Sequence, residues 1–308
     1  MSEAIYCKKL KAIYGENNGF LGGPLDLDIE LNDGFQVEIG QLGIRTITIS
    51  NVDEVSVRDL YAVLSRIVRL LMVFDGKFYM LQNLIFSESQ NNAHRLDGYA
   101  KNLVRSRLSY FESDDACSTR DLLCSFEKVL TPEVYNNWVE LLEDLDISHQ
   151  MYLYSLSANK MPVDLKVSFL IELAEPIVEL VKKKTGLYAS LSPGERGTSL
   201  KMCLDVLITK YGLEIFKKEI EVNYEAFLKV LVNSRVRIMH IKKNQKGIYL
   251  NRDESVLYML KISLLYRHIL LSLLGIDESI TKEHIQKSVD SLDNWDYILD
   301  RLLVKIRK

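Results

Sequence analysis

An arginine and a histidine separated by four residues form the pair in this sequence that is best suited to chemistry. Arg235 and His240 lie within residues 231–252, a stretch without aspartate or glutamate. Six cationic side chains occupy the same stretch: Arg235, Arg237, Lys242, Lys243, Lys246 and Arg252. The whole chain has 39 Lys and Arg residues against 42 Asp and Glu residues. The stretch is therefore a local excess of positive charge that would attract phosphate groups.

Both side chains suit the cleavage of a phosphodiester bond. A guanidinium binds a phosphate through two parallel hydrogen bonds and stabilises the extra charge of a five-coordinate transition state. An imidazole titrates near neutral pH, so it can take a proton from an RNA 2′-hydroxyl or return one to the leaving oxygen. Such cleavage needs no metal or other cofactor, and no residues occur at metal-ligand spacing. Arg235 and His240 are therefore candidate catalytic residues, and we expect no metal site.

A helix over residues 224–240 is expected to carry this pair. It would pack through Phe227, Leu228, Leu231 and Ile238, which recur at helical spacing. Residues five apart on a helix lie about 140° apart around its axis, so one copy of the pair makes a poor closed site. Two copies that face each other across a dimer would make a better one.

The elements around this helix predict an α+β fold, with a small β-rich N-terminal module before a helical bundle. Period-two alternation predicts strands at residues 24–31 and 35–39, and further strands are expected at residues 45–50 and 78–86. A helix capped by Ser56, with apolar residues at helical spacing, is expected to run to about Phe74. Helices are expected at residues 95–111, 121–130, 132–145, 163–184, 199–211, 254–274 and 288–307. Gly212 and Gly275 would close the helices that precede them. We divide the chain into residues 1–150 and 151–308.

The composition limits the classes of protein that the chain can represent. Its 308 residues carry a formal net charge of −3, which excludes a surface that is basic all over. The four cysteines show no metal or redox spacing and are expected to be reduced thiols. The start of the chain lacks the features of a secretion signal, and the apolar residues 256–274 are interrupted by charge, as in a buried amphipathic helix. We therefore expect a cytoplasmic protein without a membrane span.

Three segments of the C-terminal half together resemble the HEPN superfamily, in particular its ApeA-like branch, which is associated with antiphage defence. They are Ser199-Leu-Lys-Met-Cys-Leu-Asp, Phe227-Leu-Lys-Val-Leu-Val-Asn-Ser-Arg-Val-Arg-Ile-Met-His, and Leu271-Ser-Leu-Leu-Gly-Ile. The resemblance covers roughly residues 160–285, and the N-terminal module is similar in outline to the N-terminal domain of that branch. It implies a homodimeric ribonuclease in which Arg235 and His240 of both subunits line one cleft and cleave RNA to a cyclic phosphate. Arg237, Lys242, Lys243 and Asn233 are then the expected RNA-binding residues.

One departure from the family pattern keeps two other functions open. The family usually has a polar residue directly after the arginine, and here that residue is Val236. Because that polar residue helps to orient the pair, an inactive HEPN module that binds RNA, a nucleotide or a protein partner is an alternative. A dimerisation domain whose basic helix end has no specific role is the other alternative.

Overall fold

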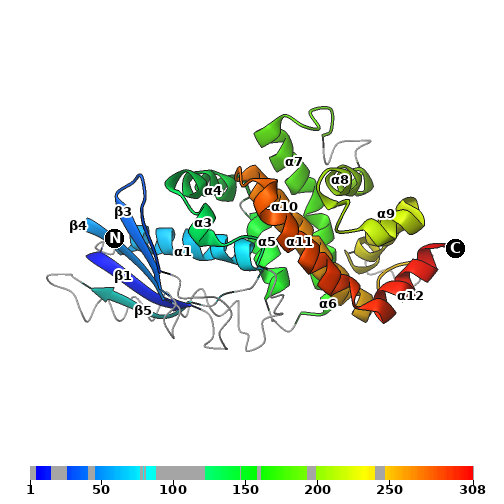
Figure 1. The fold of residues 1–308 in the computed structure, drawn as a ribbon, viewed down its shortest axis with the longest axis horizontal. Helices are drawn as coiled ribbons and strands as arrows, with labels where there is room; N and C mark the ends of the chain where they lie inside the picture. Colours follow the sequence, from blue (N-terminus) through cyan, green and yellow to red (C-terminus); the bar gives the residue numbers. More distant parts are fainter. Residues whose placement is uncertain are drawn as a thin grey trace. The chain divides into compact units, whose positions relative to one another are not determined.

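The computed structural model has an α+β architecture, as the sequence predicts (Figure 1). It describes residues 5–14, 26–40, 46–76, 79, 81–87, 122–145, 147–157, 161–192, 199–239 and 247–307. The chain divides into two compact units. The first comprises residues 1–72, 78–115 and 125–140, and the second comprises residues 73–77, 116–124 and 141–308. The division predicted at residue 150 stays a prediction, and each unit is described by itself.

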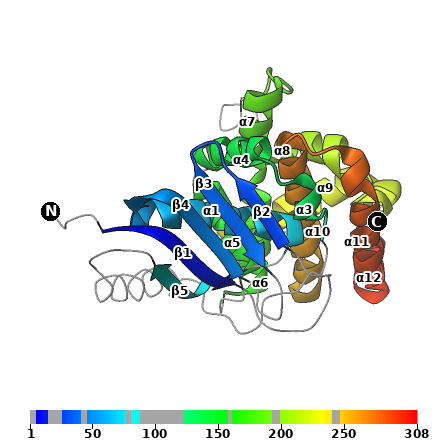
Figure 2. The same cartoon turned by 60° about the vertical axis from the view of Figure 1, so that its left-hand side comes forward.

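The first unit contains an antiparallel five-stranded sheet in the order β2-β3-β4-β1-β5. Its strands are β1 (Tyr6–Tyr14), β2 (Asp26–Glu30), β3 (Phe35–Gly40), β4 (Thr46–Ser56) and β5 (Leu81–Ser87). Figure 2 shows β1 to β4 side by side. The β2–β3 hairpin is confirmed, because Leu27 pairs with Ile39 and Ile29 with Val37 across it. On β3, Phe35, Val37 and Ile39 alternate into the core, as period-two burial requires.

Strand β1 is the part of the sheet that the sequence did not predict. Between the Cys7–Val55 and Lys9–Ser50 pairs, β1 advances by two residues and β4 by five, so the pairing is irregular there. The buried side chains of Cys7, Leu10 and Ala12 are spaced by three residues and then by two. This interruption removes the simple alternation that identifies a strand in a sequence.

The helix predicted after Ser56 is α1 (Val57–Asp75). The Ser56 hydroxyl accepts a hydrogen bond from the Arg58 backbone N–H at 3.1 Å, which satisfies one donor of the first turn. Leu60, Leu64 and Ile67 lie on its fully buried face.

The rest of the described chain is helical. The helices are α3 (Phe126–Val129), α4 (Pro132–Leu145), α5 (Ile147–Leu156), α6 (Val163–Glu172), α7 (Ala174–Thr185), α8 (Leu200–Leu207), α9 (Lys217–Met239), α10 (Arg252–Leu273), α11 (Glu278–Asp293) and α12 (Asp296–Arg307), with a π-helical turn, η1 (Ile208–Gly212). The prediction for α4 is confirmed at both ends. The helix predicted over residues 121–130 is wrong over residues 122–125, which are not helical. The one predicted over residues 95–111 lies outside the described residues.

Two long helices of the prediction are each divided in the structure. The helix predicted over residues 163–184 breaks at Leu173 into α6 and α7. Pro176 explains the break, because it has no N–H to donate to the carbonyl of Glu172 four residues earlier. The helix predicted over residues 288–307 is likewise wrong, because Asn294 ends α11 and a second helix begins at Asp296. Asp and Asn side chains compete with the helical backbone for hydrogen bonds, which favours an end at this point.

The chain between α8 and α9 also differs from the prediction. The start of α8 next to Ser199 is as predicted, and the Ser199 hydroxyl caps the helix by accepting from Met202 N–H at 3.3 Å. Gly212 does not close a helix in the left-handed conformation. It lies in the π-helical turn, where an added Cβ would come within 3.2 Å of Leu265 and of Phe216. Helix α9 begins at Lys217 and kinks at Asn223, whose side chain accepts from Ala226 N–H at 3.1 Å and restarts the helix near the predicted position.

Helix α10 forms the core of the second unit. Among the described helices it is the one that is long and apolar enough to span a membrane, and 78% of its most apolar window is buried inside the protein. The prediction that this helix is buried is confirmed, but the prediction that it is amphipathic, with its charged residues exposed, is wrong. Lys261 and Arg267, which interrupt the apolar run, are themselves buried. Gly275 follows α10 with φ of +80°, so the predicted glycine closure is confirmed here.

Candidate functional site

Arg235 lies in the last two turns of α9, within the second unit. The helix is anchored one to two turns earlier by Phe227, Leu228 and Leu231, all fully buried as predicted. Ile238, predicted to pack with them, is half-buried. Positions four and seven residues apart lie on one face of a helix, so Arg235 follows Leu231 and Leu228 on the face of α9 that is fixed in the core.

The Arg235 guanidinium forms a two-point ion pair with Glu172, the last residue of α6. Its Nε donates to Glu172 Oε2, and its Nη2 donates to Oε1 at 2.8 Å. The side chains of Arg235 and Glu172 are 23% and 29% exposed. The hydrogen bonds that Arg235 donates to Glu172 raise the pKa of Arg235 above its ordinary value. Sequence reasoning missed Glu172, which lies 63 residues before its partner.

Two residues that precede Arg235 tie α9 to the chain that returns toward α10. Asn233 Nδ2 donates to the Ile248 carbonyl at 3.1 Å, and Leu250 N–H donates to the Ser234 hydroxyl at 2.8 Å. These bonds hold the two sides of the 240–246 connection together. Asn233, predicted to bind RNA, thus contacts the backbone of Ile248 in the structure.

Arg237 contacts an aromatic ring on the return segment, residues 247–251, which leads into α10. Its guanidinium carbon lies 4.2 Å from the centroid of the Tyr249 ring, which is a close cation–π contact. His240, Lys242 and Lys243 lie outside the described residues, so their predicted roles stay predictions.

In a comparison with known protein families, residues 168–280 match the Apea-like HEPN family. Residues 168–280 form an Apea-like HEPN domain. The predicted family is therefore confirmed, and the match contains both Glu172 and Arg235. No curated protein and no solved structure matches the chain significantly.

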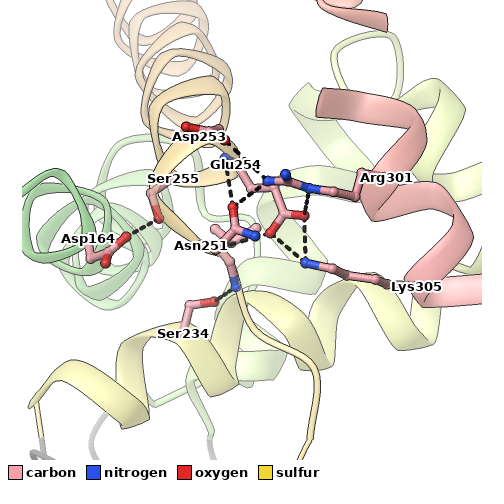
Figure 3. Close-up of polar contacts among 9 residues, drawn as sticks. Asp164, Ser234, Asn251, Asp253, Glu254, Ser255, Arg301 and Lys305 are labelled. Atoms are coloured by element: carbon pink, nitrogen blue, oxygen red, sulfur yellow. Dashed lines mark hydrogen bonds and ion pairs between the residues drawn. The ribbon is translucent and has the colours of Figure 1, made fainter. Parts of the chain in front are cut away.

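A polar network supports the HEPN domain next to the return segment (Figure 3). Asn251 caps α10, and Glu254 closes a capping box with it. Lys305 of α12 donates to both Glu254 carboxylate oxygens at 2.6 and 2.9 Å, and Arg301 donates to Asn251 Oδ1 at 2.6 Å. Because α12 lies beyond the matched residues, the C-terminal helix holds the start of α10 from outside the family segment.

The structure corrects the charge pattern that the sequence suggested around Arg235. Residues 231–252 contain no acid, but the fold brings Glu172 into direct contact with Arg235, and the nearby Glu175 also raises its pKa. The available signal for Glu172 was an acidic residue directly after the apolar residues Phe169, Leu170 and Ile171. In the folded protein, the net charge around Arg235 is therefore less positive than residues 231–252 alone would suggest.

Metal ligation and thiol chemistry find no support in the described part of the chain. It contains no group of three or more His, Cys, Asp or Glu side chains that could hold a metal ion. Cys7, Cys124 and Cys203 are buried thiols. Burial raises the pKa of Cys7 and Cys203 to about 11 and that of Cys124 to about 12. Such thiols are protonated and unreactive near neutral pH.

Proposed function

We propose that the chain is a metal-independent HEPN endoribonuclease that acts as a cytoplasmic homodimer in antiphage defence or abortive infection. The observation that carries the proposal is the placement of Arg235, inside the HEPN match, on a helix fixed by buried residues and beside an oriented carboxylate. A guanidinium held in this way is suited to bind and stabilise a reacting phosphate.

In the proposed reaction, the RNA 2′-oxygen attacks the adjacent phosphorus while the bond from phosphorus to the 5′-oxygen breaks. His240 takes the 2′-hydroxyl proton, and a second imidazole from the partner copy returns a proton to the leaving 5′-oxygen. Arg235 stabilises the extra negative charge of the five-coordinate phosphorus. The products are a 2′,3′-cyclic phosphate and a 5′-hydroxyl. Arg237, Lys242, Lys243 and Asn233 are the proposed contacts to the rest of the RNA.

Val236 favours a second candidate function, an inactive HEPN module that binds RNA, a nucleotide or a partner protein. Valine has no polar atom with which to orient Arg235 or His240, whereas the family pattern has a polar residue at this position. The two functions share the same basic segment and differ in whether the phosphodiester bond breaks.

Cleavage of a labelled single-stranded RNA in EDTA tests the proposal. The full chain should cleave the RNA, and His240→Ala should lower the rate by about 10²–10⁴-fold, as loss of a general acid–base does. Arg235→Ala should lower it by about 10²–10³-fold through loss of charge stabilisation. The matched controls are His284→Ala and Arg58→Ala, which lie outside the segment and should cleave as the wild type does.

The same experiment identifies the alternative. If the wild type leaves RNA intact but binds it with an affinity that falls steeply with salt, the nuclease proposal is wrong and the binding module is right. Cleavage that survives in His240→Ala would also contradict the assignment of the chemistry to this pair.

A further inference from the structure

We infer that Glu172 is a positioning residue that orients the Arg235 guanidinium for the scissile phosphate, an inference that rests on the proposed nuclease function. The contact is specific, because both carboxylate oxygens accept from two different nitrogens of the same guanidinium. A two-point contact of this kind fixes orientation as well as distance.

The backbone on both sides of the pair is held in place. Glu172 lies between Ile171 and Leu173, both buried, at the break between α6 and α7. Leu173 N–H donates to the Phe169 carbonyl at 3.1 Å, so the last turn of α6 stays closed up to Glu172. On the other side, Ser234 next to Arg235 accepts from Leu250 N–H. Neither partner therefore has to be ordered by the substrate.

The geometry of the guanidinium determines what this contact does. The group is planar and rigid, so a carboxylate on its Nε and Nη2 atoms sets the plane of the group and the direction of Nη1. A catalytic donor that is already oriented stabilises the transition state without reorganisation during the reaction. Glu172 also cancels much of the Arg235 charge. Arg235 should consequently contribute more to the rate of the chemical step than to the affinity for RNA.

The opposite role would be masking, in which Glu172 competes with phosphate for the same donors. The two roles give opposite results when the carboxylate is replaced. Loss of a positioning residue lowers kcat at nearly constant KM, whereas loss of a mask raises both the affinity for RNA and the rate.

Steady-state cleavage of a single-stranded RNA oligonucleotide by Glu172→Gln is the first measurement. We expect kcat to fall by about tenfold or more with KM changed less than about threefold, as for an interaction realised in the transition state. Glu175→Gln removes a nearby carboxylate of the same charge and should change kcat much less. Glu172→Asp keeps the charge and should retain more activity than Glu172→Gln. Unchanged kinetics in Glu172→Gln, or a higher rate, would overturn the inference.

Binding of an uncleavable 2′-O-methyl oligonucleotide separates this inference from the nuclease proposal. If Glu172 orients Arg235, Arg235→Ala should weaken binding more in the wild type than in the Glu172→Gln background, which is coupling in a double-mutant cycle. If Arg235→Ala matters only after Glu172 is replaced, Glu172 is a mask and the inference fails. Coupling in a chain that does not cleave RNA would retain the positioning role and refute the nuclease. Cleavage of RNA without such coupling would retain the nuclease proposal and refute the positioning role of Glu172.

Discussion

Charged groups inside the second unit are held by specific partners. Lys261 is fully buried and contacts Glu219 at 2.7 Å and Asp293 at 2.8 Å. The Tyr258 hydroxyl donates to Glu219 at 2.7 Å, and burial raises the pKa of Tyr258 well above its ordinary value, so it stays a donor. Since a buried charge without a partner is costly, each of these side chains requires the others.

Arg267 is used differently, as a cap on backbone carbonyls at the end of α1. Its Nε and Nη2 each donate at 2.7 Å, to the carbonyls of Val73 and Phe74. Gly76 follows with φ of +65°, and a Cβ at Gly76 would lie 2.3 Å from Arg267 Nη1. Glycine is therefore needed here both for the backbone conformation and for the space that the guanidinium occupies.

Gly76→Ala should thus destabilise the protein more than the same change at another left-handed glycine. Gly275 is the matched control, because its φ is +80° and an added Cβ meets nothing within 4 Å. We expect Gly275→Ala to lower the free energy of unfolding by about 1 kcal/mol through backbone strain alone. Gly76→Ala should lower it by about 3 kcal/mol, since the charged hydrogen bonds of Arg267 are also disturbed. Urea unfolding of both variants measures the difference, and equal losses would refute it.

At the scale of elements, the sequence predicted what short-range patterns determine. The β2–β3 hairpin, α4 and the start of α1 follow from alternation, helical spacing and caps within a few residues. The π-helical turn at η1 had no such signal, because it depends on the close packing of Gly212 against Leu265. Arg235 was predicted from a motif within a few residues, whereas its contact with Glu172 depends on packing between distant segments and left no local signal. Their contact requires α6 and α9 to pack together.

The network at the start of α10 allows a test of how α12 holds this element. Glu254 is fully buried and accepts from Lys305 and from the Asn251 backbone, whereas Asp253, on the same turn, is 62% exposed and 3.5 Å from Arg301 (Figure 3). Glu254→Ala should lower the free energy of unfolding by about 3 kcal/mol, because it removes a fully buried carboxylate and leaves the half-buried Lys305 and the Asn251 N–H without their acceptor. Asp253→Ala should lower it by less than about 1 kcal/mol. Chemical denaturation compares them, and similar losses would mean that the buried carboxylate does not anchor α12.

At the scale of the whole molecule, the net charge of −3 is an average over regions of different sign. Residues 231–252 contain cations and no acids, yet Glu172 balances Arg235 in space. A phosphate would therefore be attracted mainly by the other cations of this stretch and oriented by Arg235. One chain supplies one Arg235–His240 pair, whereas the proposed reaction uses a proton acceptor and a proton donor together. This requirement is the physical argument for a site built from two copies.

Mixing experiments distinguish a shared site from two independent ones. When half of the wild type is replaced by an Arg235→Ala/His240→Ala double variant and the subunits exchange, only about one quarter of the dimers contain two intact copies, as expected for a symmetric pair. RNA cleavage should therefore fall to about one quarter if both copies are required and to about one half if each copy works alone. Replacing half of the protein with Arg58→Ala should leave the rate unchanged, and sedimentation should show a dimer throughout. A linear decrease with the fraction of double variant would refute the shared cleft, because each subunit would then carry a complete set of catalytic groups.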